Sequence, residues 1–399
     1  MKNVAIINAY NGGSTGNIAI NLYNALESRG FNPYLCYAAE FYGKKSNLCN
    51  EIKICSKLYR KIQRVLGRIT GLQGSFSYVA TKKLIHKFKN IKIDTIYLVN
   101  IHCDTVNERL LFKYSNDFKA KIIYVMIDEY PMTGRCCYPE KCEQYKTGCL
   151  DCKNLSLYPP AILNTTKFGV FRKQKSYNLA FSLAFSAPMS VIERAKESFL
   201  LKDRKLVCIN EGINTNIFCV KKDLGLRNKL HIPEDKIFIL FVAPSGDLRK
   251  GCIDYIKCVK RFENNPGYYF LHIGYTSNYE LPSNYNYLGY ITDQTLLADY
   301  MSCADLFVFP SVADSSPSAC LNAIACGTPI LCYDLPGMTC MGESPIINAV
   351  KEHNIDEMIS FIQHTTRKTD ELSQVCRKHA LDYFDEKDMA GRLISLALN

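Results

Sequence analysis

Two neighbouring basic residues, Arg249 and Lys250, follow an apolar segment and precede Gly251. An arginine offers a planar fork of N–H donors and a lysine a compact positive charge, so the pair suits a diphosphate. A solvated basic turn would have the same composition. Because ligands of parallel sheets bind at the carboxyl ends of the strands, the position of the pair after an apolar run favours ligand binding.

A second polar loop, residues 310–317, leads into an expected helix of small residues that ends at Gly327. Ser318 and Ala319 stand near the start of that helix. A helix N-terminus presents free N–H groups and the positive end of the helix dipole, so it attracts phosphate. The alternative is the capped helix of an ordinary α/β unit.

The first apolar segment ends in a glycine-rich loop that contains Gly13 and Gly16 and leads into an amphipathic helix. Glycine lets the backbone approach a ligand closely, and the following helix start could bind an anion. A tight strand–helix turn capped by Ser14 or Thr15 is an equally good interpretation.

One cluster of cysteines differs from the others, which stand alone in apolar segments and are expected to pack as small hydrophobic side chains. It places four thiols within seventeen residues: Cys136, Cys142, Cys149 and Cys152. Four thiolates could hold a tetrahedral Zn²⁺ with no open position, so this zinc would be structural. Cys137 could replace Cys136, and a loop of free thiols is the alternative.

Residues 53–69 predict a basic amphipathic helix whose apolar side chains are Ile54, Leu58, Ile62, Val65 and Ile69. Such a helix suits an anionic membrane surface or a lipid diphosphate, although a surface helix with its apolar stripe in the core fits equally well. Residues 1–205 carry 32 Lys and Arg against 15 Asp and Glu, whereas residues 206–399 carry 17 against 23. The basic half predicts an anionic partner, and no zinc-finger, RNP or basic-zipper pattern indicates nucleic acid.

Buried strands must position these loops, and short apolar runs separated by helix-length segments provide them. The expected strands are Val4–Tyr10, Tyr34–Ala39, Thr95–Ile101, Ile122–Asp128, Leu179–Ser186, Ile237–Ala243, Tyr268–Ile273, Tyr285–Ile291, Leu306–Pro310 and Pro329–Tyr333. Continuous apolar runs are typical of strands buried on both faces of a parallel sheet. Their alternation with helices predicts an α/β fold of two Rossmann-like, doubly wound domains that face each other across a cleft.

The 399 residues exceed what one ordinary core accommodates. We expect a first domain over 1–205, a second over 206–375 and a terminal helix over 376–399, within a helical segment 372–399, that could cross back to the first domain. The N-terminus lacks the pattern of a signal peptide, and no apolar run is long enough to span a bilayer. These features predict a cytoplasmic protein, with the inner face of the plasma membrane as a second location.

Taken together, the motifs resemble the retaining family-4 glycosyltransferases of the GT-B fold. The donor-binding motif of that family resembles residues 310–329, and the glycine loop and the Lys250-Gly251 pair stand where the family has them. The segments 210–218 and 304–305 also match. The segments 100–102 and 132–134, with the cysteine cluster, resemble a polysaccharide- and lipopolysaccharide-biosynthesis subgroup.

The resemblance implies transfer of a hexosyl-type sugar, with retention, from a nucleoside-diphosphate sugar. It implies that Asp314 orients the sugar and that Asn322 binds the ribose. Arg249, Lys250 and the helix end at Ser318–Ala319 would stabilise the negative charge on the departing diphosphate.

On the acceptor side, the resemblance implies a hydroxyl of a growing glycan or a lipid-linked acceptor. His102 and Asp128 follow strands of the first domain and are the candidate catalytic residues there, beside Asp314. Gly13 and its loop would face the donor phosphates or the acceptor. No cofactor is required for the chemistry that the family performs, so a zinc ion would have only a structural role.

Several positions depart from the family pattern. Ile127 replaces a histidine, Asn322 replaces an acid, and Cys340 replaces a glutamate. Pro244 replaces an arginine for which only Arg249 could substitute, and Asp314 is a shorter acid than the family's glutamate. Two other functions therefore stay open. One is a catalytically silent protein that binds a sugar or scaffolds polysaccharide assembly, and the other is an enzyme of different chemistry on the same fold, such as a nucleotide-sugar epimerase.

Overall fold

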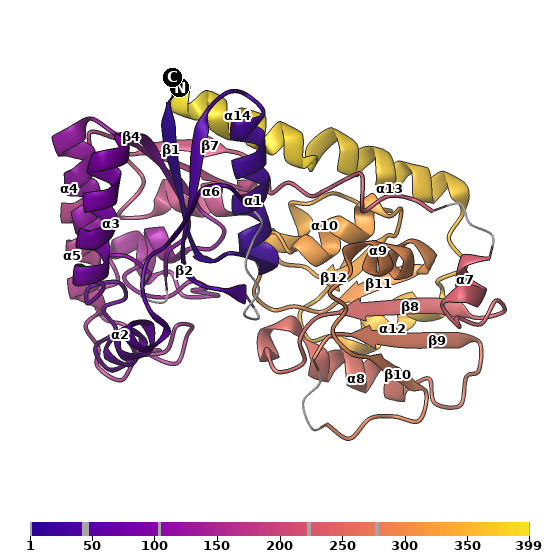
Figure 1. The fold of residues 1–399 in the computed structure, drawn as a ribbon. Helices are drawn as coiled ribbons and strands as arrows, with labels where there is room; N and C mark the ends of the chain where they lie inside the picture. The colour runs from indigo at the N-terminus through magenta and orange to yellow at the C-terminus, as the bar shows by residue number, and fades with distance from the viewer. Residues whose placement is uncertain (1, 42–47, 103–104, 222–224, 276–278, 399) are drawn as a thin grey trace. The chain divides into compact units, whose positions relative to one another are not determined.

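The computed structural model describes residues 2–41, 48–102, 105–221, 225–275 and 279–398 (Figure 1). Its chain divides into two compact units. The first contains residues 1–210 and 387–399, and the second contains residues 211–386. The first unit therefore ends a few residues beyond the expected position 205, and it also includes the end of the chain.

The first unit is built on a seven-stranded, fully parallel sheet in the order β3-β2-β1-β4-β5-β6-β7. The strands are β1 (Asn3–Tyr10), β2 (Asn32–Ala39), β3 (Glu51–Lys53), β4 (Ile93–Asn100), β5 (Lys121–Val125), β6 (Ser182–Ala187) and β7 (Lys205–Cys208). The sequence did not predict β3 and β7, because both are short edge strands that are only half-buried.

Helices cover both faces of this sheet: α1 (Gly13–Glu27), α2 (Lys57–Thr70), α3 (Tyr78–Ile91), α4 (Glu108–Phe118), α5 (Thr166–Tyr177), α6 (Met189–Glu197) and α14 (Glu386–Leu398), with short 3-10 turns at Tyr130–Met132 and Gln144–Thr147. Val4 and Ile6 of β1 pack into one core with α1 and α14. Ala5 and Ile7 pack into the opposite core with α3 and α4. This burial on both faces explains the continuous apolar run of β1.

The end of the chain forms two helices, α13 (Asp370–Tyr383) and α14, so the expectation of one continuous helix is wrong. The break follows Phe384, whose carbonyl accepts a hydrogen bond from the N–H of Ile213 at 2.8 Å. Helix α14, drawn in yellow beside the indigo N-terminal segment in Figure 1, belongs to the first unit. The hydroxyl of Tyr97 on β4 donates to the carbonyl of Leu393 at 3.0 Å.

The second unit contains a six-stranded parallel sheet in the order β10-β9-β8-β11-β12-β13. Its strands are β8 (Ile237–Val242), β9 (Tyr268–Ile273), β10 (Tyr285–Leu288), β11 (Leu306–Phe309), β12 (Ile330–Tyr333) and β13 (Ile347–Val350). Its other helices are α7 (Leu226–Lys229), α8 (Cys252–Lys260), α9 (Gln294–Cys303), α10 (Ser318–Ala325), α11 (Pro336–Thr339) and α12 (Ile355–Gln363), with a 3-10 turn at Leu248–Lys250. The predicted α/β class with two parallel-sheet domains is confirmed.

Both sheets contain a topological switch point, where the strand order reverses. It lies between β1 and β4 in the first unit and between β8 and β11 in the second. Loops that leave the carboxyl ends of such strands diverge and make room for a ligand. Across the described residues, none of the helices has the length and apolar character that a membrane span requires.

Helix α2 differs from its prediction in two respects. It begins at Lys57 rather than at residue 53, because Lys53 ends β3 and Ser56 caps the helix by accepting the N–H of Tyr59 at 3.2 Å. Its apolar stripe also stays outside the core, with exposures of 69% at Leu58 and 49% at Ile62. The alternative in which the stripe packs into the core is therefore wrong.

Candidate functional site

The loops that follow β8 and β11 pack directly against each other at the switch point of the second unit. Gly251 has a φ of 75°, and a Cβ atom added there would lie 1.9 Å from the carbonyl oxygen of Pro310. The Val312 N–H donates to the carbonyl of Arg249 at 2.8 Å, and the Ser311 hydroxyl oxygen lies 2.9 Å from the same carbonyl oxygen. Only glycine fits at position 251, and the two loops predicted to bind ligand form one surface.

The centre of this surface is an ion pair between Lys250 and Asp314. The Lys250 ammonium lies 2.8 and 2.9 Å from the two carboxylate oxygens, and the Ser311 hydroxyl donates to one of them at 2.6 Å. The Asp314 side chain is 8% exposed and that of Lys250 20%. Lys250, predicted to bind the diphosphate, and Asp314, predicted to orient the sugar, are therefore in direct contact and hold each other in position.

Arg249 is held by its own loop. Its guanidinium donates to both oxygens of Asp247, at 3.1 and 2.7 Å, and to the carbonyl of Ala313 at 3.3 Å. These contacts make Arg249 a brace between the loops after β8 and β11. Its direct contact with a diphosphate stays a prediction.

Helix α10 contributes the third predicted element. Ser318 and Ala319 form its first two positions, after Pro317 as N-cap. Asn322 lies one turn further on, and its buried side-chain Oδ1 has no hydrogen-bond partner among the described residues. An amide oxygen in this state can accept the hydroxyl of a ribose, which is the role predicted for Asn322.

Glu211 lies near the ion pair and was not singled out from the sequence. Burial raises the pKa of its carboxyl to about 8, with the Asp314 carboxylate raising it further and Lys250 opposing the shift. The protonated carboxyl therefore dominates at neutral pH and can donate a hydrogen bond.

This raised pKa predicts a pH-dependent stability. An unfolded glutamate loses its proton near pH 4.3, so between about pH 4.5 and 8 the native state holds a proton that the unfolded state has lost. The free energy of unfolding then falls as the pH rises, by at most about 1.4 kcal/mol per pH unit from this group. In urea titrations, the stability of Glu211→Gln relative to wild type should rise from pH 5 to 8. A constant difference, like that expected for the exposed control Glu280→Gln, would contradict this assignment.

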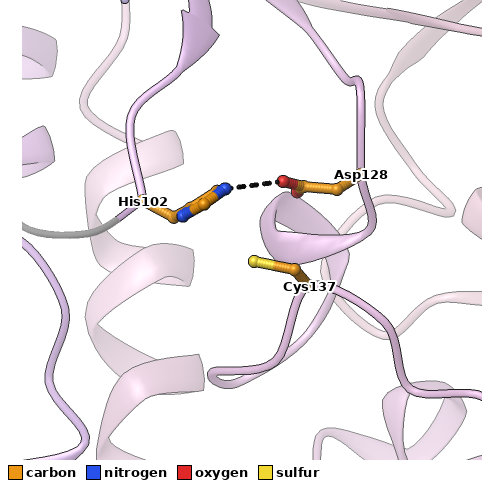
Figure 2. A group of neighbouring side chains, drawn as sticks. All are labelled: His102, Asp128 and Cys137. Atoms are coloured by element: carbon orange, nitrogen blue, oxygen red, sulfur yellow. Dashed lines mark ion pairs between the residues drawn. The ribbon is translucent and has the colours of Figure 1, made fainter. Parts of the chain in front are cut away.

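In the first unit, the loops after β4 and β5 bring together the two side chains predicted for the acceptor side (Figure 2). The Nε2 atom of His102 lies 3.1 Å from an Asp128 carboxylate oxygen, and both side chains are buried. The other oxygen of Asp128 accepts the N–H of Tyr130 at 2.9 Å. Strand β5 ends at Val125, earlier than predicted, so Asp128 lies in a turn. Position 127, where the resemblance leads one to expect a histidine, is Ile127, and a role for His102 in the reaction stays a prediction.

Cys137 completes the group drawn in Figure 2. Its Sγ atom and the ligand atoms of His102 and Asp128 all lie within 4.8 Å of one another, in a buried position. A carboxylate that accepts the imidazole N–H orients the ring and stabilises its protonated form, which suits proton transfer. The same three side chains are also chemically able to bind a metal ion.

Two buried cations, neither found from the sequence, support the loop that carries Asp128. The Lys173 ammonium donates to the carbonyls of Tyr130 and Thr133, and burial lowers its pKa to about 8. The Arg135 guanidinium donates to the carbonyls of Leu157 at 2.8 Å and Asn154 at 3.1 Å. A single lysine or arginine in a helix or loop looks like an ordinary surface residue in the sequence, so nothing there indicates that it is buried against backbone carbonyls.

The cysteines of the predicted metal cluster line one cavity of about 300 Å³: Cys136, Cys142, Cys149 and Cys152. Within the described part of the chain, their sulfurs are not gathered within 4.8 Å of one another, as a closed tetrahedral site would require. Cys137 does not line the cavity and lies instead with His102. The donor chemistry fits zinc, and the alternative with Cys137 in place of Cys136 has no support from this cavity.

Gly13 is required by local packing. It begins α1 with a φ of 74°, and an added Cβ atom would lie 2.8 Å from the ring of Phe41. The N-cap is Gly12, so the expected cap at Ser14 or Thr15 is wrong. The buried Asn8 side chain donates to Thr15, and its oxygen accepts the N–H of Asn100, so it ties the start of α1 to the end of β4. A ligand contact at Gly13 stays a prediction.

Comparisons with known proteins agree with this arrangement. Residues 225–343 match the family model for glycosyl transferases group 1. A protein assigned to colanic acid biosynthesis as a glycosyl transferase, WcaC of Escherichia coli K12, is 27% identical over 213 residues, which are 53% of this chain and 51% of that protein. TuaC of Bacillus subtilis 168, assigned to teichuronic acid biosynthesis as a glycosyltransferase, is 25% identical over 116 residues, which are 29% of each chain. The chain thus matches about half the length of the first of these relatives and less of the second.

Several solved structures share the whole fold at low sequence identity. Sucrose-phosphate synthase from Thermosynechococcus elongatus has a TM-score of 0.71 at 14% identity, covering 99% of this chain and 98% of that one. HepE of Anabaena, solved with UDP-glucose, has a TM-score of 0.68 at 13% identity and 99% coverage of both chains. WaaG, a glycosyltransferase involved in lipopolysaccharide biosynthesis, has a TM-score of 0.66 at 14% identity, covering 99% and 98%. The chain therefore has the GT-B fold of these glycosyltransferase structures, and its residues 225–343 match the glycosyl transferases group 1 family.

Proposed function

We propose that the protein transfers a sugar from a nucleoside-diphosphate sugar to a hydroxyl of a growing glycan during polysaccharide biosynthesis. The observation that carries this proposal is the Lys250–Asp314 pair at the switch point of the domain that matches the glycosyl transferase family. The names of the similar proteins support polysaccharide assembly, and the HepE structure with UDP-glucose supports a nucleotide-sugar donor.

On the donor side, the leaving diphosphate gains negative charge as the bond to the sugar breaks. Lys250 would stabilise that charge together with the N–H groups at Ser318 and Ala319, because preorganised donors act most strongly where charge develops. Asp314 would accept sugar hydroxyls, and Asn322 would bind the ribose. Retention of the anomeric configuration is part of the proposal.

On the acceptor side, His102 and Asp128 would position the acceptor hydroxyl and take its proton. The Asp128 carboxylate would orient the imidazole and stabilise the positive charge that the ring gains when it takes the proton. We expect His102→Ala to lower acceptor-dependent turnover by roughly 10²-fold or more, with donor binding unchanged. Turnover and donor binding are measured separately, by nucleotide release and by calorimetry.

The variant Asp128→Asn gives a second measurement of the same pair. It retains the size of the side chain but lacks the negative charge that would stabilise the imidazolium formed when His102 takes the proton, so acceptor-dependent turnover should fall by roughly 10²-fold or more with donor binding unchanged. Unchanged turnover in both variants would remove this pair from the reaction and leave it a structural contact.

The experiment that tests the function is a panel of UDP- and GDP-sugars, read by thermal shift and by release of free nucleotide. The proposal expects one donor class to stabilise the protein and to be consumed only when an acceptor extract is present. Stabilisation without turnover would indicate a silent binding protein, and donor conversion without an acceptor would indicate an epimerase-type enzyme. Absence of any shift would overturn the donor site.

We further propose that the cavity lined by the four cysteines holds a structural zinc ion. The supporting observation is the convergence on one cavity of four thiols that are spread over seventeen residues. Zinc bound there would hold together the loop that also carries Cys137 and Arg135. It would take no part in the transfer, since four protein ligands leave no position for a substrate.

A further inference from the structure

A basic pocket of about 630 Å³ lies beside helix α2 in the first unit. Six cations line it: Lys53, Lys57, Arg60, Lys61, Arg64 and Arg68. Glu40 is the only acid among its lining residues, and it is paired with Lys53 at 2.9 Å. The remaining five cations have no acidic counterpart in the lining, so the pocket attracts a multivalent anion.

Arg60 is the innermost of these cations. It is 7% exposed, and its guanidinium carbon lies 4.5 Å from the centre of the Tyr10 ring. Its Nε and Nη2 atoms are buried without a hydrogen-bond partner among the described residues. A buried guanidinium with unused donors is costly unless a ligand satisfies it, and phosphate oxygens match its fork geometry.

The apolar stripe of α2 lies next to this basic face. At 3.6 residues per turn, Leu58, Ile62, Val65 and Ile69 occupy the side of the helix adjoining the cations, while Gln63 and Gly67 face the core. The four apolar side chains are 41–69% exposed. Val65 belongs to both faces, because it is exposed and also lines the pocket. The surface that binds anions is thus continuous with the apolar surface of the helix.

We propose that this pocket binds the diphosphate of a lipid-linked acceptor, whose hydrocarbon chain lies along the exposed stripe of α2. A diphosphate carries enough charge to engage several of the five cations, which a single phosphate would leave mostly unmatched. The stripe explains why the ligand is an amphiphile rather than free phosphate, since covering exposed aliphatic side chains with a hydrocarbon chain is favourable. The inference rests on the proposed function, because the sugar acceptor would be the glycan attached to this lipid.

Calorimetry on the full chain, without any donor, tests the site with two soluble probes, farnesyl diphosphate and inorganic pyrophosphate. We expect farnesyl diphosphate to bind at least about tenfold more tightly, from burial of its chain. The pair Leu58→Ser with Ile62→Ser should reduce its affinity to that of pyrophosphate. The pair Lys61→Ala with Arg64→Ala should weaken both probes by about tenfold or more, since charge-assisted contacts are lost.

The matched control is Lys83→Ala with Lys87→Ala, two exposed lysines on α3 outside the pocket, which should bind both probes like wild type. Equal affinity for the two probes would indicate a free-anion site and overturn the lipid assignment. If the α2 variants bind both probes with the affinity of the wild type, the pocket is not the binding site. Vesicles of phosphatidylcholine and phosphatidylglycerol that bind through α2, when farnesyl diphosphate does not, would make the bilayer the occupant. Because these titrations contain no donor, a negative result contradicts the lipid diphosphate site but not the donor site. A negative result in the donor panel likewise leaves the lipid diphosphate site untouched.

Discussion

Replacing Lys250 with methionine should lower kcat/KM for sugar transfer by roughly 10²- to 10³-fold, which is the typical cost of removing one preorganised donor from a developing negative charge. The Lys250 ammonium forms an ion pair with Asp314, the acid that is predicted to orient the sugar. Binding of the free nucleoside diphosphate should also weaken, because the same charge faces the product. Initial rates and calorimetry with the donor identified in the panel provide the measurement.

The ion pair complicates this variant, because Lys250→Met leaves Asp314 buried without its partner, which destabilises proteins by about 3–5 kcal/mol. The double variant Lys250→Met with Asp314→Asn removes both charges and should recover most of that stability. Because Asp314 is itself predicted to orient the sugar, Asp314→Asn is measured alone for comparison, and turnover of the double variant should lie well below it if Lys250 acts on the diphosphate. Recovery of turnover along with stability would mean that the lysine only supports the fold. Lys260→Ala, an exposed lysine on α8, is the matched control.

Loss of zinc should produce the second large effect, on stability rather than on chemistry. We expect the protein purified without chelator to contain about one zinc ion per chain by mass spectrometry of the metal. Structural zinc binding contributes about 10–16 kcal/mol in zinc-finger peptides, so losing the metal should lower the free energy of unfolding by at least about 3 kcal/mol. Cys149→Ser and Cys152→Ser should therefore lose the metal and unfold at lower denaturant concentration.

Two further cysteine variants locate the ion. Cys49→Ser removes an exposed cysteine outside the cluster and should keep both the metal and the stability. Cys137→Ser separates the two possible ligand groups, because Cys137 lies with His102 and Asp128 and not in the cysteine-lined cavity. Metal that survives Cys149→Ser and is lost in Cys137→Ser would place the ion at His102 and overturn the four-cysteine site. A protein without metal would remove the zinc proposal altogether.

The apolar pattern of the sequence determined the fold class and most strands. Runs buried on both faces have no polar interruptions, so β1, β8 and β11 were recognisable with nearly their observed bounds. The edge strands β3, β7 and β13 are short and only partly buried, so they had no such pattern and were not predicted. The break at Phe384 was also invisible, because it depends on hydrogen bonds with Ile213, which lies far away in the chain.

The same division holds for the sites. The sequence predicted Lys250, His102 and Asp128 from their positions after buried strands, where ligands of parallel sheets bind, and it predicted Asp314 from the family resemblance. Only the tertiary structure decided which of them meet, since the strand order places β8 beside β11 and β4 beside β5. It also decided the outward direction of the α2 stripe, because the periodicity of a helix shows that it has an apolar face but not what covers that face.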